Sequence, residues 1–307
     1  MNLNAAFYDD IQNTAVPFYR AMMAVQQQRE QPDPVPLLEV RRGRAESPAW
    51  YMIQAAEFDP EPLTVAKLRV RDIYASETMA LALLEMLASE TWLDRRGDEY
   101  YLTEEGRTVM NRLKTRAANL LQGVAPPGQI DVARLEGLLR RVIEASLACP
   151  TPPGSWCLAH SRHRASGDEA PALLRLYHYI ADFNAFRDDA HMAAWQPLEV
   201  TGYEWEAFSF IASGQAETAA ALFHQLAYRG YSQEDYAKAL QKLAEHGWLV
   251  QEGNTYQLTE AGRAVQSEVE QRTDDYFYAP WHEALNEAEL GEAIELLRCV
   301  REEWHTE

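Results

Sequence analysis

The sequence predicts a mostly α-helical protein that carries one small β-hairpin in each half of the chain. Three observations predict this fold class: apolar residues recur at three- and four-residue spacing, one segment is repeated, and each repeat contains two short extended runs around a glycine. With 307 residues and an apolar fraction of 47%, the chain is long and apolar enough for two domains with buried cores.

The repeat covers 34 residues. Residues 76–109 align without a gap with residues 232–265, which lie 156 positions later, and 14 of the 34 positions are identical. Chance would give about two identities at ordinary residue frequencies. We therefore predict an internal duplication, in which the chain carries one structural unit twice.

Each copy begins with a predicted helix. Ser76 and Ser232 stand where a side-chain oxygen can cap the first free backbone N–H groups, and acidic residues follow in the first turn. Leucines at three- and four-residue spacing then give each helix one apolar stripe. We expect the two helices to end near Thr91 and Gly247.

A hairpin and a longer helix follow in each copy. Gly97 and Gly253 stand between two short extended runs, as in hairpin turns. Acidic residues after Thr103 and Thr259 then open the next helix, which the first copy is expected to extend over residues 104–122.

A preceding helix and a tight turn complete each copy, over residues 63–76 and 217–232. The order of helix, turn, helix and two-stranded wing is that of a winged helix-turn-helix. It resembles the winged-helix domains of MarR-type bacterial regulators, whose wings often end in a Leu-Thr-x-x-Gly-Arg run before a long helix, and the resemblance covers about half of the chain. The predicted fold class is mostly α with small β-hairpin wings, in two tandem winged-helix units joined by helices.

The resemblance also implies how the two copies are arranged. MarR-type regulators are dimers of one winged domain, so two copies in one chain imply an internal pseudo-dimer, while the oligomeric state of the whole chain stays open. A second resemblance is to a family of uncharacterised bacterial helix-turn-helix proteins. It rests on the order of three segments: residues 186–195, the second wing and residues 273–281. This resemblance implies no mechanism.

Breaks in the pattern predict three parts of the chain. Residues 1–123 hold the first winged unit with leading helices, residues 124–200 form a helical connector, and residues 201–307 hold an acidic second winged unit with a closing helix. The remaining predicted segments are a helix over 1–30 broken near Pro17, a proline-rich connector over 31–40, helices over 48–58, 131–148, 171–186 and 287–305, and a helix capped by Asp188 or Asp189.

The first twenty residues hold two aspartates and no unbroken apolar run. They predict neither a signal peptide nor a membrane span, so a cytoplasmic protein without membrane contact is expected. Cys149, Cys157 and Cys299 show no CxxC spacing, which favours free thiols over a disulfide or a zinc site.

The charge distribution disfavours a nucleic-acid partner. The net charge is −19, and residues 201–307 alone hold 7 Lys and Arg against 20 Asp and Glu. Such a surface repels phosphates, because nucleic-acid affinity depends on cations that displace counterions. In the first copy, residues 75–90 contain no Arg, Lys, Asn or Gln, the types that read base edges. The second copy offers Gln233, Lys238, Gln241 and Lys242 beside Glu234, Asp235 and Glu245.

DNA binding through the first unit is nevertheless kept as an alternative hypothesis. Its candidate residues are Lys67, Arg69, Arg71, Arg95, Arg96, Arg112 and Lys114, with Arg116 and the tract Arg41, Arg42 and Arg44 as extensions. The competing interpretation is that these cations pair with neighbouring carboxylates.

The best constellation for metal binding or catalysis lies in residues 178–191. His178 and Asp182 share one helical face at i, i+4, and His191 follows, a spacing that suits a divalent metal. A capping aspartate and surface hydrogen bonds explain the same residues. No nucleotide-binding, nucleophile-elbow or zinc-protease motif is present, so no catalytic residue, metal or cofactor is predicted, and an enzyme is the second alternative. A basic surface loop, with anion binding as its alternative, is predicted at His160, Arg162, His163 and Arg164.

Aromatic residues suggest a pocket for a small apolar ligand at the interface between the units. Its candidate lining is Tyr177, Phe183, Phe186, Trp195, Trp205 and Phe208, and a plain aromatic core is the competing interpretation. The leading hypothesis is a non-enzymatic, regulator-type tandem winged-helix protein that binds a protein partner or a small apolar ligand. A DNA-binding transcriptional regulator of MarR-like type is the alternative.

Overall fold

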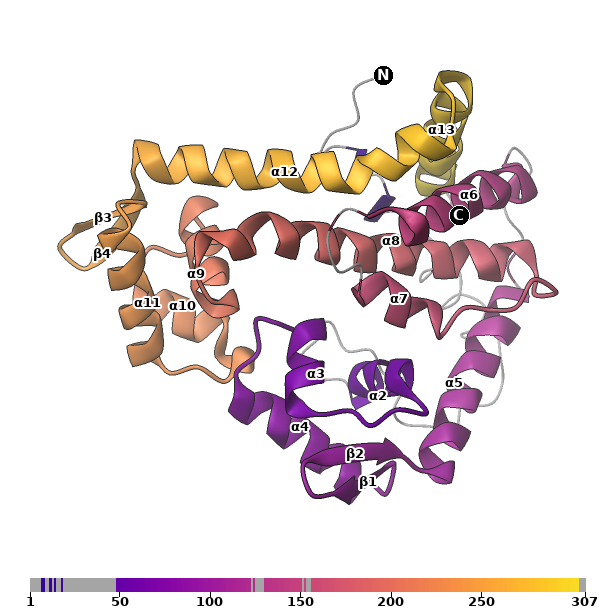
Figure 1. The fold of residues 1–307 in the computed structure, drawn as a ribbon, viewed down its shortest axis with the longest axis horizontal. Helices are drawn as coiled ribbons and strands as arrows, with labels where there is room; N and C mark the ends of the chain where they lie inside the picture. The colour runs from indigo at the N-terminus through magenta and orange to yellow at the C-terminus, as the bar shows by residue number, and fades with distance from the viewer. Residues whose placement is uncertain are drawn as a thin grey trace. The chain divides into compact units, whose positions relative to one another are not determined.

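The computed structural model describes residues 7–8, 11–12, 14, 18, 48–122, 124, 130–150, 152 and 156–303. Over these residues the chain is mostly helical, with two separate two-stranded antiparallel sheets, so the predicted fold class is confirmed (Figure 1). One compact body contains residues 108–193, 272–303 and the described residues before 19, and is called the helical body. The other contains residues 48–107 and 194–271, and is called the winged body.

The first winged helix lies in the winged body. Its elements are α2 (Pro48–Phe58), α3 (Val65–Arg71), α4 (Glu77–Ser89), β1 (Leu93–Arg96) and β2 (Glu99–Leu102). Ser76 caps α4 as predicted, because its Oγ accepts the Met79 N–H at 3.1 Å. Leu84 and Leu87 of α4 are buried, and Leu93 pairs with Leu102 at the base of the antiparallel wing.

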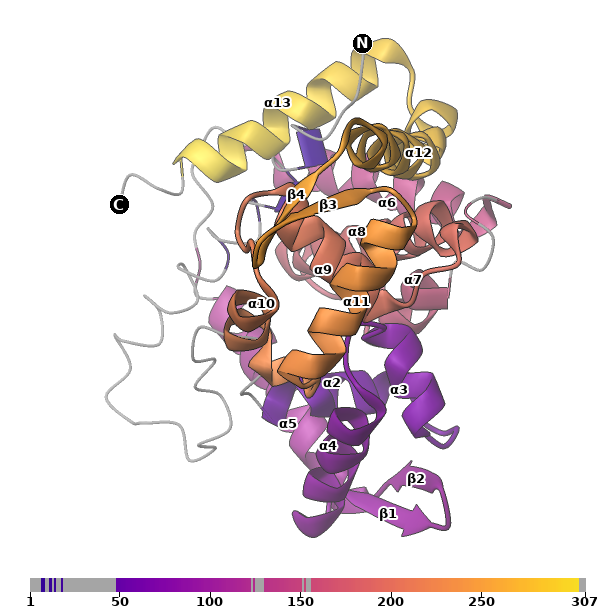
Figure 2. The same cartoon turned by 90° about the vertical axis from the view of Figure 1, so that its left-hand side faces the viewer.

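The second winged helix repeats this order in the same body. Its elements are α9 (Gly202–Ala212), α10 (Ala219–Gln225), the 3₁₀ turn η4 (Ala227–Arg229), α11 (Gln233–Glu245), β3 (Leu249–Glu252) and β4 (Thr255–Leu258). Ser232 and Asp235 form a capping box at the start of α11. Gly230 ends η4 with φ 79°, a conformation that glycine adopts without strain. Figure 2 shows the second hairpin beside α11.

The bases of the two wings have the same local chemistry. The Thr103 hydroxyl donates to the Trp92 carbonyl at 3.1 Å and accepts the Gly106 N–H at 2.9 Å. In the second winged helix, Thr259 makes both bonds, to the Trp248 carbonyl at 3.1 Å and from the Gly262 N–H at 3.0 Å. The identical Thr-x-x-Gly spacing in the sequence therefore produces the same wing-to-helix turn twice.

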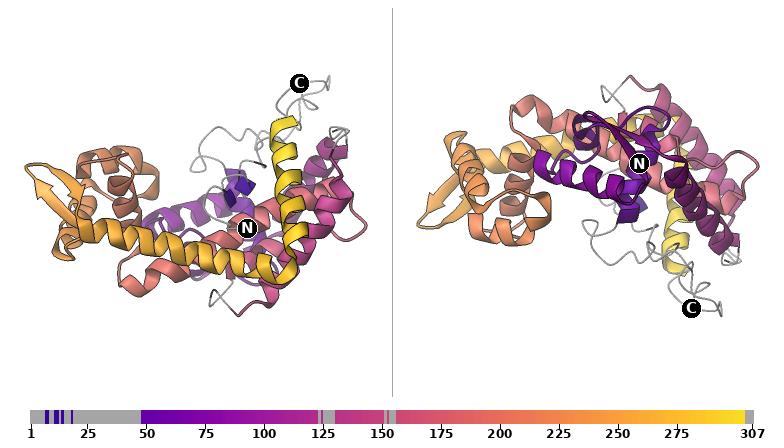
Figure 3. Two further views of the ribbon diagram at one scale, coloured as in Figure 1. Left: turned by 90° about the horizontal axis from the view of Figure 1, so that it is seen from above. Right: turned by 90° about the horizontal axis from the view of Figure 1, so that it is seen from below.

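The helical body is organised around an aromatic core. Its helices are most of α5 (Glu104–Gln122), α6 (Val132–Ala148), α7 (Trp156–Arg162), most of α8 (Ala172–Trp195), the second part of α12 (Glu260–Ala284) and α13 (Glu287–Glu303). Phe183 and Phe186 of α8 pack against Phe277 and Trp281 of α12, and all four side chains are fully buried. Figure 3 shows α13 turning away steeply from the end of α12.

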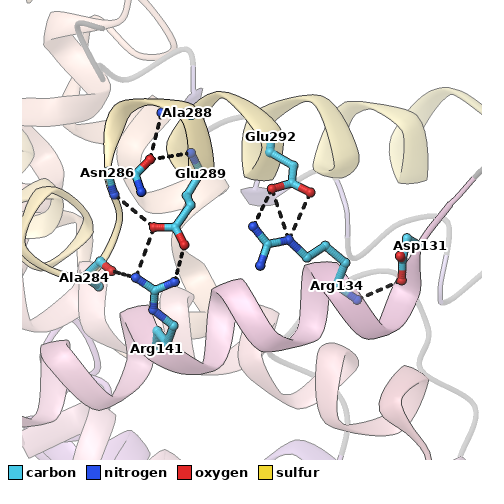
Figure 4. A network of polar contacts seen from close by, with 8 residues as sticks. All are labelled: Asp131, Arg134, Arg141, Ala284, Asn286, Ala288, Glu289 and Glu292. Carbon is cyan, nitrogen blue, oxygen red and sulfur yellow. Dashed lines mark hydrogen bonds and ion pairs between the residues drawn. The ribbon is translucent and has the colours of Figure 1, made fainter.

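Two arginines of α6 tie α13 to this body (Figure 4). Arg134 meets the Glu292 carboxylate with contacts of 2.6 and 3.0 Å. Arg141 binds Glu289 at 2.6 Å and also donates to the Ala284 carbonyl. The closing helix predicted over 287–305 therefore packs on α6.

Two local predictions are wrong. No helix begins at Asp188 or Asp189, because α8 runs unbroken from Ala172 to Trp195. Asp189 instead caps α7, and its carboxylate accepts the backbone N–H groups of residues 156, 157 and 158 at 3.1, 2.8 and 2.9 Å. The stretch predicted as a basic loop is partly helical, since His160 and Arg162 lie in α7.

Other predictions are not tested in this way. The break near Pro17, the connector over 31–40 and the tract Arg41, Arg42 and Arg44 lie outside the described residues. The predicted three-part division, with boundaries at 123/124 and 200/201, assigns consecutive residues to each part. The two compact bodies are instead each built from segments that are distant in sequence, so the three-part division stays a prediction. Within the described part of the chain, no helix combines the length and apolar character needed to cross a membrane.

Candidate functional site

The second helix of a winged helix-turn-helix is its usual contact surface, and in the first copy this helix is α4. The residues of α4 most open to solvent include Glu77, Thr78, Leu81, Ala82 and Ser89. None of them is Arg, Lys, Asn or Gln, and Leu81 leaves 42% of its surface exposed. The fold therefore turns outward an acidic and apolar face, as the residue content of this helix indicated.

The corresponding face of α11 carries more polar groups, and three of them bind carboxylates. The Lys238 ammonium lies 2.8 Å from Glu234, and the Gln241 amide donates to Glu245 at 3.2 Å. Lys242 reaches Glu204 of α9 at 2.9 Å. Burial acts to raise the pKa of Glu204, but hydrogen bonds from the backbone of Thr201 and from Lys242 lower it overall. Lys242 therefore ties α11 to the start of α9.

The predicted DNA-binding cations are mostly paired. Four of them form ion pairs: Lys67–Glu61 at 3.2 Å, Arg71–Glu57 at 3.0 Å, Arg95–Glu85 at 2.7 Å and Arg96–Asp94 at 2.8 Å. Arg69 donates through Nε to the Ala75 carbonyl at 3.1 Å. Arg112 and Lys114 are exposed on α5 in the helical body, whereas the other five lie in the winged body. The pairing favours the ion-pair interpretation for the first winged helix.

The two winged helices touch through the turns that precede α4 and α11 (Figures 1 and 2). This contact is called the turn contact and joins residues 72–76 with residues 229–231. Ser76 N–H donates to the Arg229 carbonyl at 2.8 Å, and the Tyr231 hydroxyl donates to the Ala75 carbonyl at 3.4 Å. The two winged helices are therefore in direct contact within the winged body, and an internal pseudo-dimer of MarR-like type stays a prediction.

A charged cluster lies at the centre of the turn contact. The Arg229 guanidinium binds Asp72 at 2.8 Å and Glu206 at 2.7 Å, and it lies over the rings of Tyr74 and Tyr228. The side chains of Arg229, Asp72 and Glu206 are only 16%, 20% and 11% exposed. Burial raises the pKa of Glu206 despite the arginine, and the nearby Asp72 charge adds to the rise.

Sequence reasoning missed Arg229. The residue 156 positions earlier is Ile73, so the two copies differ there by a charge. A lone arginine in a turn between helices gives no signal of burial. The difference between the copies was the one available sign that this position does something in the second copy that it does not do in the first.

The six aromatic residues of the predicted pocket lie in two cores. Phe183 and Phe186 are fully buried in the helical body, and Tyr177 packs against the same core. The other three, Trp195, Trp205 and Phe208, are buried in the winged body, where Trp205 lies 6.0 Å from Trp195 and 5.2 Å from Phe208 between ring centroids. Each set packs as a core does, and a shared ligand pocket stays a prediction.

The metal candidates each have a protein partner. The Ser166 N–H donates to Nδ1 of His178 at 3.0 Å, so this nitrogen is an acceptor and the ring is neutral. Asp182 accepts from Ser161 at 2.7 Å and pairs with Arg162 at 2.7 Å. Burial raises the pKa of Asp182, and the neighbouring positive charge of Arg162 opposes this rise.

His191 lies apart from that pair, with Nδ1 at 3.2 Å from the Thr273 hydroxyl, and burial lowers its pKa to about 4. Among the described residues, no group of three or more His, Cys, Asp or Glu side chains is arranged to hold a metal ion. A site in residues 178–191 therefore stays a hypothesis.

Residues 107–306 match the model of a family described as a helix-turn-helix family. The matched region includes the whole second winged helix and begins after β2 of the first. Neither the curated proteins nor the solved structures gave a significant match.

Proposed function

Because the chain belongs to this helix-turn-helix family, we propose that it is a regulator-type protein without enzymatic activity whose winged helices bind a protein partner. One observation carries the proposal: the exposed face of α4 is apolar and acidic, where a reader of base edges needs Arg, Lys, Asn or Gln. Exposed apolar side chains favour burial against another protein.

Further exposed apolar side chains support this proposal. In the winged body they include Val70 of α3, Leu81 of α4, Phe223 of α10, Tyr228 of η4 and Val250 of β3, which leave 40–44% of their surfaces exposed. They belong to the two helix-turn-helix motifs and to the second wing. A protein partner would bury these side chains, whereas a phosphate backbone gains nothing from them.

We further propose that the two winged helices descend from one MarR-like unit. The 14 identities over 34 aligned residues support this origin, and so do the matching hydrogen bonds of Thr103 and Thr259. The family match begins at residue 107 and covers one of the two copies. A solved relative with a single copy of the motif would supply the missing comparison.

Two experiments test the proposal. Titration with a random DNA duplex at low salt is expected to show no steep dependence of affinity on salt, whereas a slope equivalent to several phosphates would establish the DNA-binding alternative instead.

A photo-crosslinker placed beside α4 is expected to capture a protein partner, and the Leu81→Asp substitution is expected to abolish this capture. Leu147→Asp is the matched control, because Leu147 is as exposed, at 43%, but lies on α6 of the helical body. Equal capture by both variants would refute the assigned surface.

A further inference from the structure

A hollow lies at the base of the first wing, where α4, the wing and the start of α5 meet (Figure 1). Its volume is about 540 Å³, which is in the usual range for sites that receive a ligand group. Ala88 of α4, Leu93 of β1 and Leu102 of β2 give it apolar walls, and Asp94 and Glu104 are among its polar lining residues. This feature is called the wing hollow.

Thr91, which lines the wing hollow, has a backbone conformation that threonine rarely adopts. Its φ is 63°, in the left-handed region where a β-branched residue is strained. The second winged helix has Gly247 at the matching position, with φ 76° and no such strain. Both residues form the same turn, since their N–H groups donate to the carbonyls of Ala88 and Ala244 at 3.0 and 2.9 Å. The turn can therefore be made with glycine and does not require threonine.

The Thr91 side chain holds a carboxylate beside the wing hollow. Its hydroxyl donates to Glu105 at 2.6 Å. The residue that matches Glu105 in the second copy is Ala261, so the threonine and the glutamate occur together in the first copy and are both replaced in the second. The backbone strain at Thr91 thus accompanies a hydroxyl that fixes the position of Glu105, and strain of this kind is concentrated at binding sites.

The two copies share the apolar walls of this hollow but not its polar lining. The wall residues have identical counterparts in the second copy, which are Ala244, Leu249 and Leu258. Asp94 and Tyr101, in contrast, match Val250 and Gln257. The walls belong to the winged-helix fold itself, whereas the charged lining distinguishes the first winged helix from the second.

Carboxylates outnumber cations at the wing hollow. Arg96 and Arg107 line it, and each binds a carboxylate, Asp94 at 2.8 Å and Asp59 at 2.7 Å. Three more carboxylates line the hollow or bond to residues that do, and they belong to Glu99, Glu104 and Glu105. Among the described residues of this region, five carboxylates therefore stand against two guanidinium groups. The rim is negative, and the Glu104 side chain is 89% exposed.

We propose that the wing hollow receives a lysine or arginine side chain of the protein partner, with the aliphatic stem against the apolar walls and the charged end among the carboxylates of the rim. Lysine and arginine commonly bury their stems along apolar surface while the charged end stays in a polar environment. A negative rim also attracts a basic partner by charge complementarity. This inference rests on the proposed function and deepens it, because it gives the chemistry of the partner's contact.

NMR titration with N-acetyl-lysine methylamide tests the wing hollow without the partner. The norleucine analogue, which keeps the aliphatic stem and lacks the ammonium group, and the glutamate analogue are the comparisons. We expect the lysine compound to shift the amides of Thr91 and Glu104 and to bind about tenfold more tightly than the norleucine compound, which lacks the charged hydrogen bond. Equal binding of the lysine compound and either analogue, or no shift at the wing hollow, would overturn the inference.

Thr91→Gly separates a role in binding from a role in folding. Glycine relieves the backbone strain, so the melting temperature should rise by about 2–4 °C. The lysine compound should nevertheless bind about threefold more weakly, because Glu105 loses the hydroxyl that positions it. Thr91→Ser keeps the hydroxyl and should keep the affinity. A Thr91→Gly chain that binds as tightly as the parent, or that melts at a lower temperature, would contradict the positioning role.

Glu105→Gln and Glu260→Gln form a matched pair of charge variants. Each removes one negative charge from an exposed residue in the first turn of the helix that follows a wing. Glu105→Gln should weaken binding of the lysine compound about tenfold, and Glu260→Gln should leave it unchanged. Equal weakening by both would show an effect of net charge alone and refute the wing hollow as the site. Failure of the crosslinker at α4 to capture a partner would count against the proposed function, whereas these titrations report on the wing hollow alone.

Discussion

Replacing Gly262 by alanine tests the wing-to-helix turn that the two winged helices share. A Cβ at this position would overlap the Trp248 carbonyl oxygen, and it would lie 3.0 Å from the Trp248 carbonyl carbon and 2.9 Å from Leu258 Cδ2. The carbonyl belongs to the backbone, so no side-chain rotation relieves the overlap. The helix must instead move away from the wing, which strains the bonds that Thr259 makes to the same carbonyl at 3.0 and 3.1 Å.

The expected cost follows from these contacts. Overpacking costs about 1–3 kcal/mol, and each weakened hydrogen bond adds about 1 kcal/mol. We therefore expect Gly262→Ala to lower the free energy of unfolding by about 3 kcal/mol, and the melting temperature by roughly 6–12 °C. Chemical and thermal unfolding followed by circular dichroism measure both quantities.

Gly137→Ala is the matched control for this substitution. Gly137 lies inside α6, and a Cβ there would meet nothing within 4 Å. The control should stabilise the chain by about 0.5–1 kcal/mol, because alanine favours a helix interior over glycine. If Gly262→Ala proved as stable as the parent or the control, the close approach of helix and wing would be refuted.

Three further predictions concern the helical body. Asp189→Ala should lower the free energy of unfolding by about 1–3 kcal/mol, since three backbone N–H groups lose their acceptor; an unchanged denaturation midpoint would contradict this. Burial, aided by nearby cations, lowers the pKa of His178 to about 4, so its contribution to stability is complete above pH 6.5 and is lost as the pH falls towards 4. His178→Gln should reduce this loss in unfolding measured across that range, and parallel curves would argue against a buried neutral ring. Arg141 and the Asn286 backbone hold the pKa of Glu289 at about 2, so Arg141→Met should raise it towards its usual range in an NMR titration, and an unmoved pKa would exclude the ion pair.

The local structure of the winged helices could be predicted from the sequence because its signals are short in range. The N-cap of α4 at Ser76 and the wing turn at Gly97 depend on residues within three or four positions. The Thr-x-x-Gly repeat likewise acts through neighbouring backbone groups. For the same reason, the sequence indicated correctly that α4 lacks base-reading side chains.

The errors arose where a local signal serves a distant partner. Asp189 has the character of a capping residue, but the helix it caps begins 33 positions earlier. Arg71 resembles a free surface cation, yet it pairs with Glu57 across a distance of 14 residues and is 6% exposed. In each case the residue type predicted the kind of interaction but not the residue it is made with, because tertiary packing decides which groups meet.

The sequence by itself determined the helices and hairpins of the two winged helices, their order, and where each wing turns. These properties depend on spacing and on caps, which act over a few residues. Only the tertiary structure decided which surfaces stay open, since the contact between Arg229 and Asp72 joins residues 157 positions apart. Burial and charge pairing across such separations depend on how the helices pack, and that packing buries the Ser76 cap of α4 while the matching Ser232 cap of α11 stays exposed.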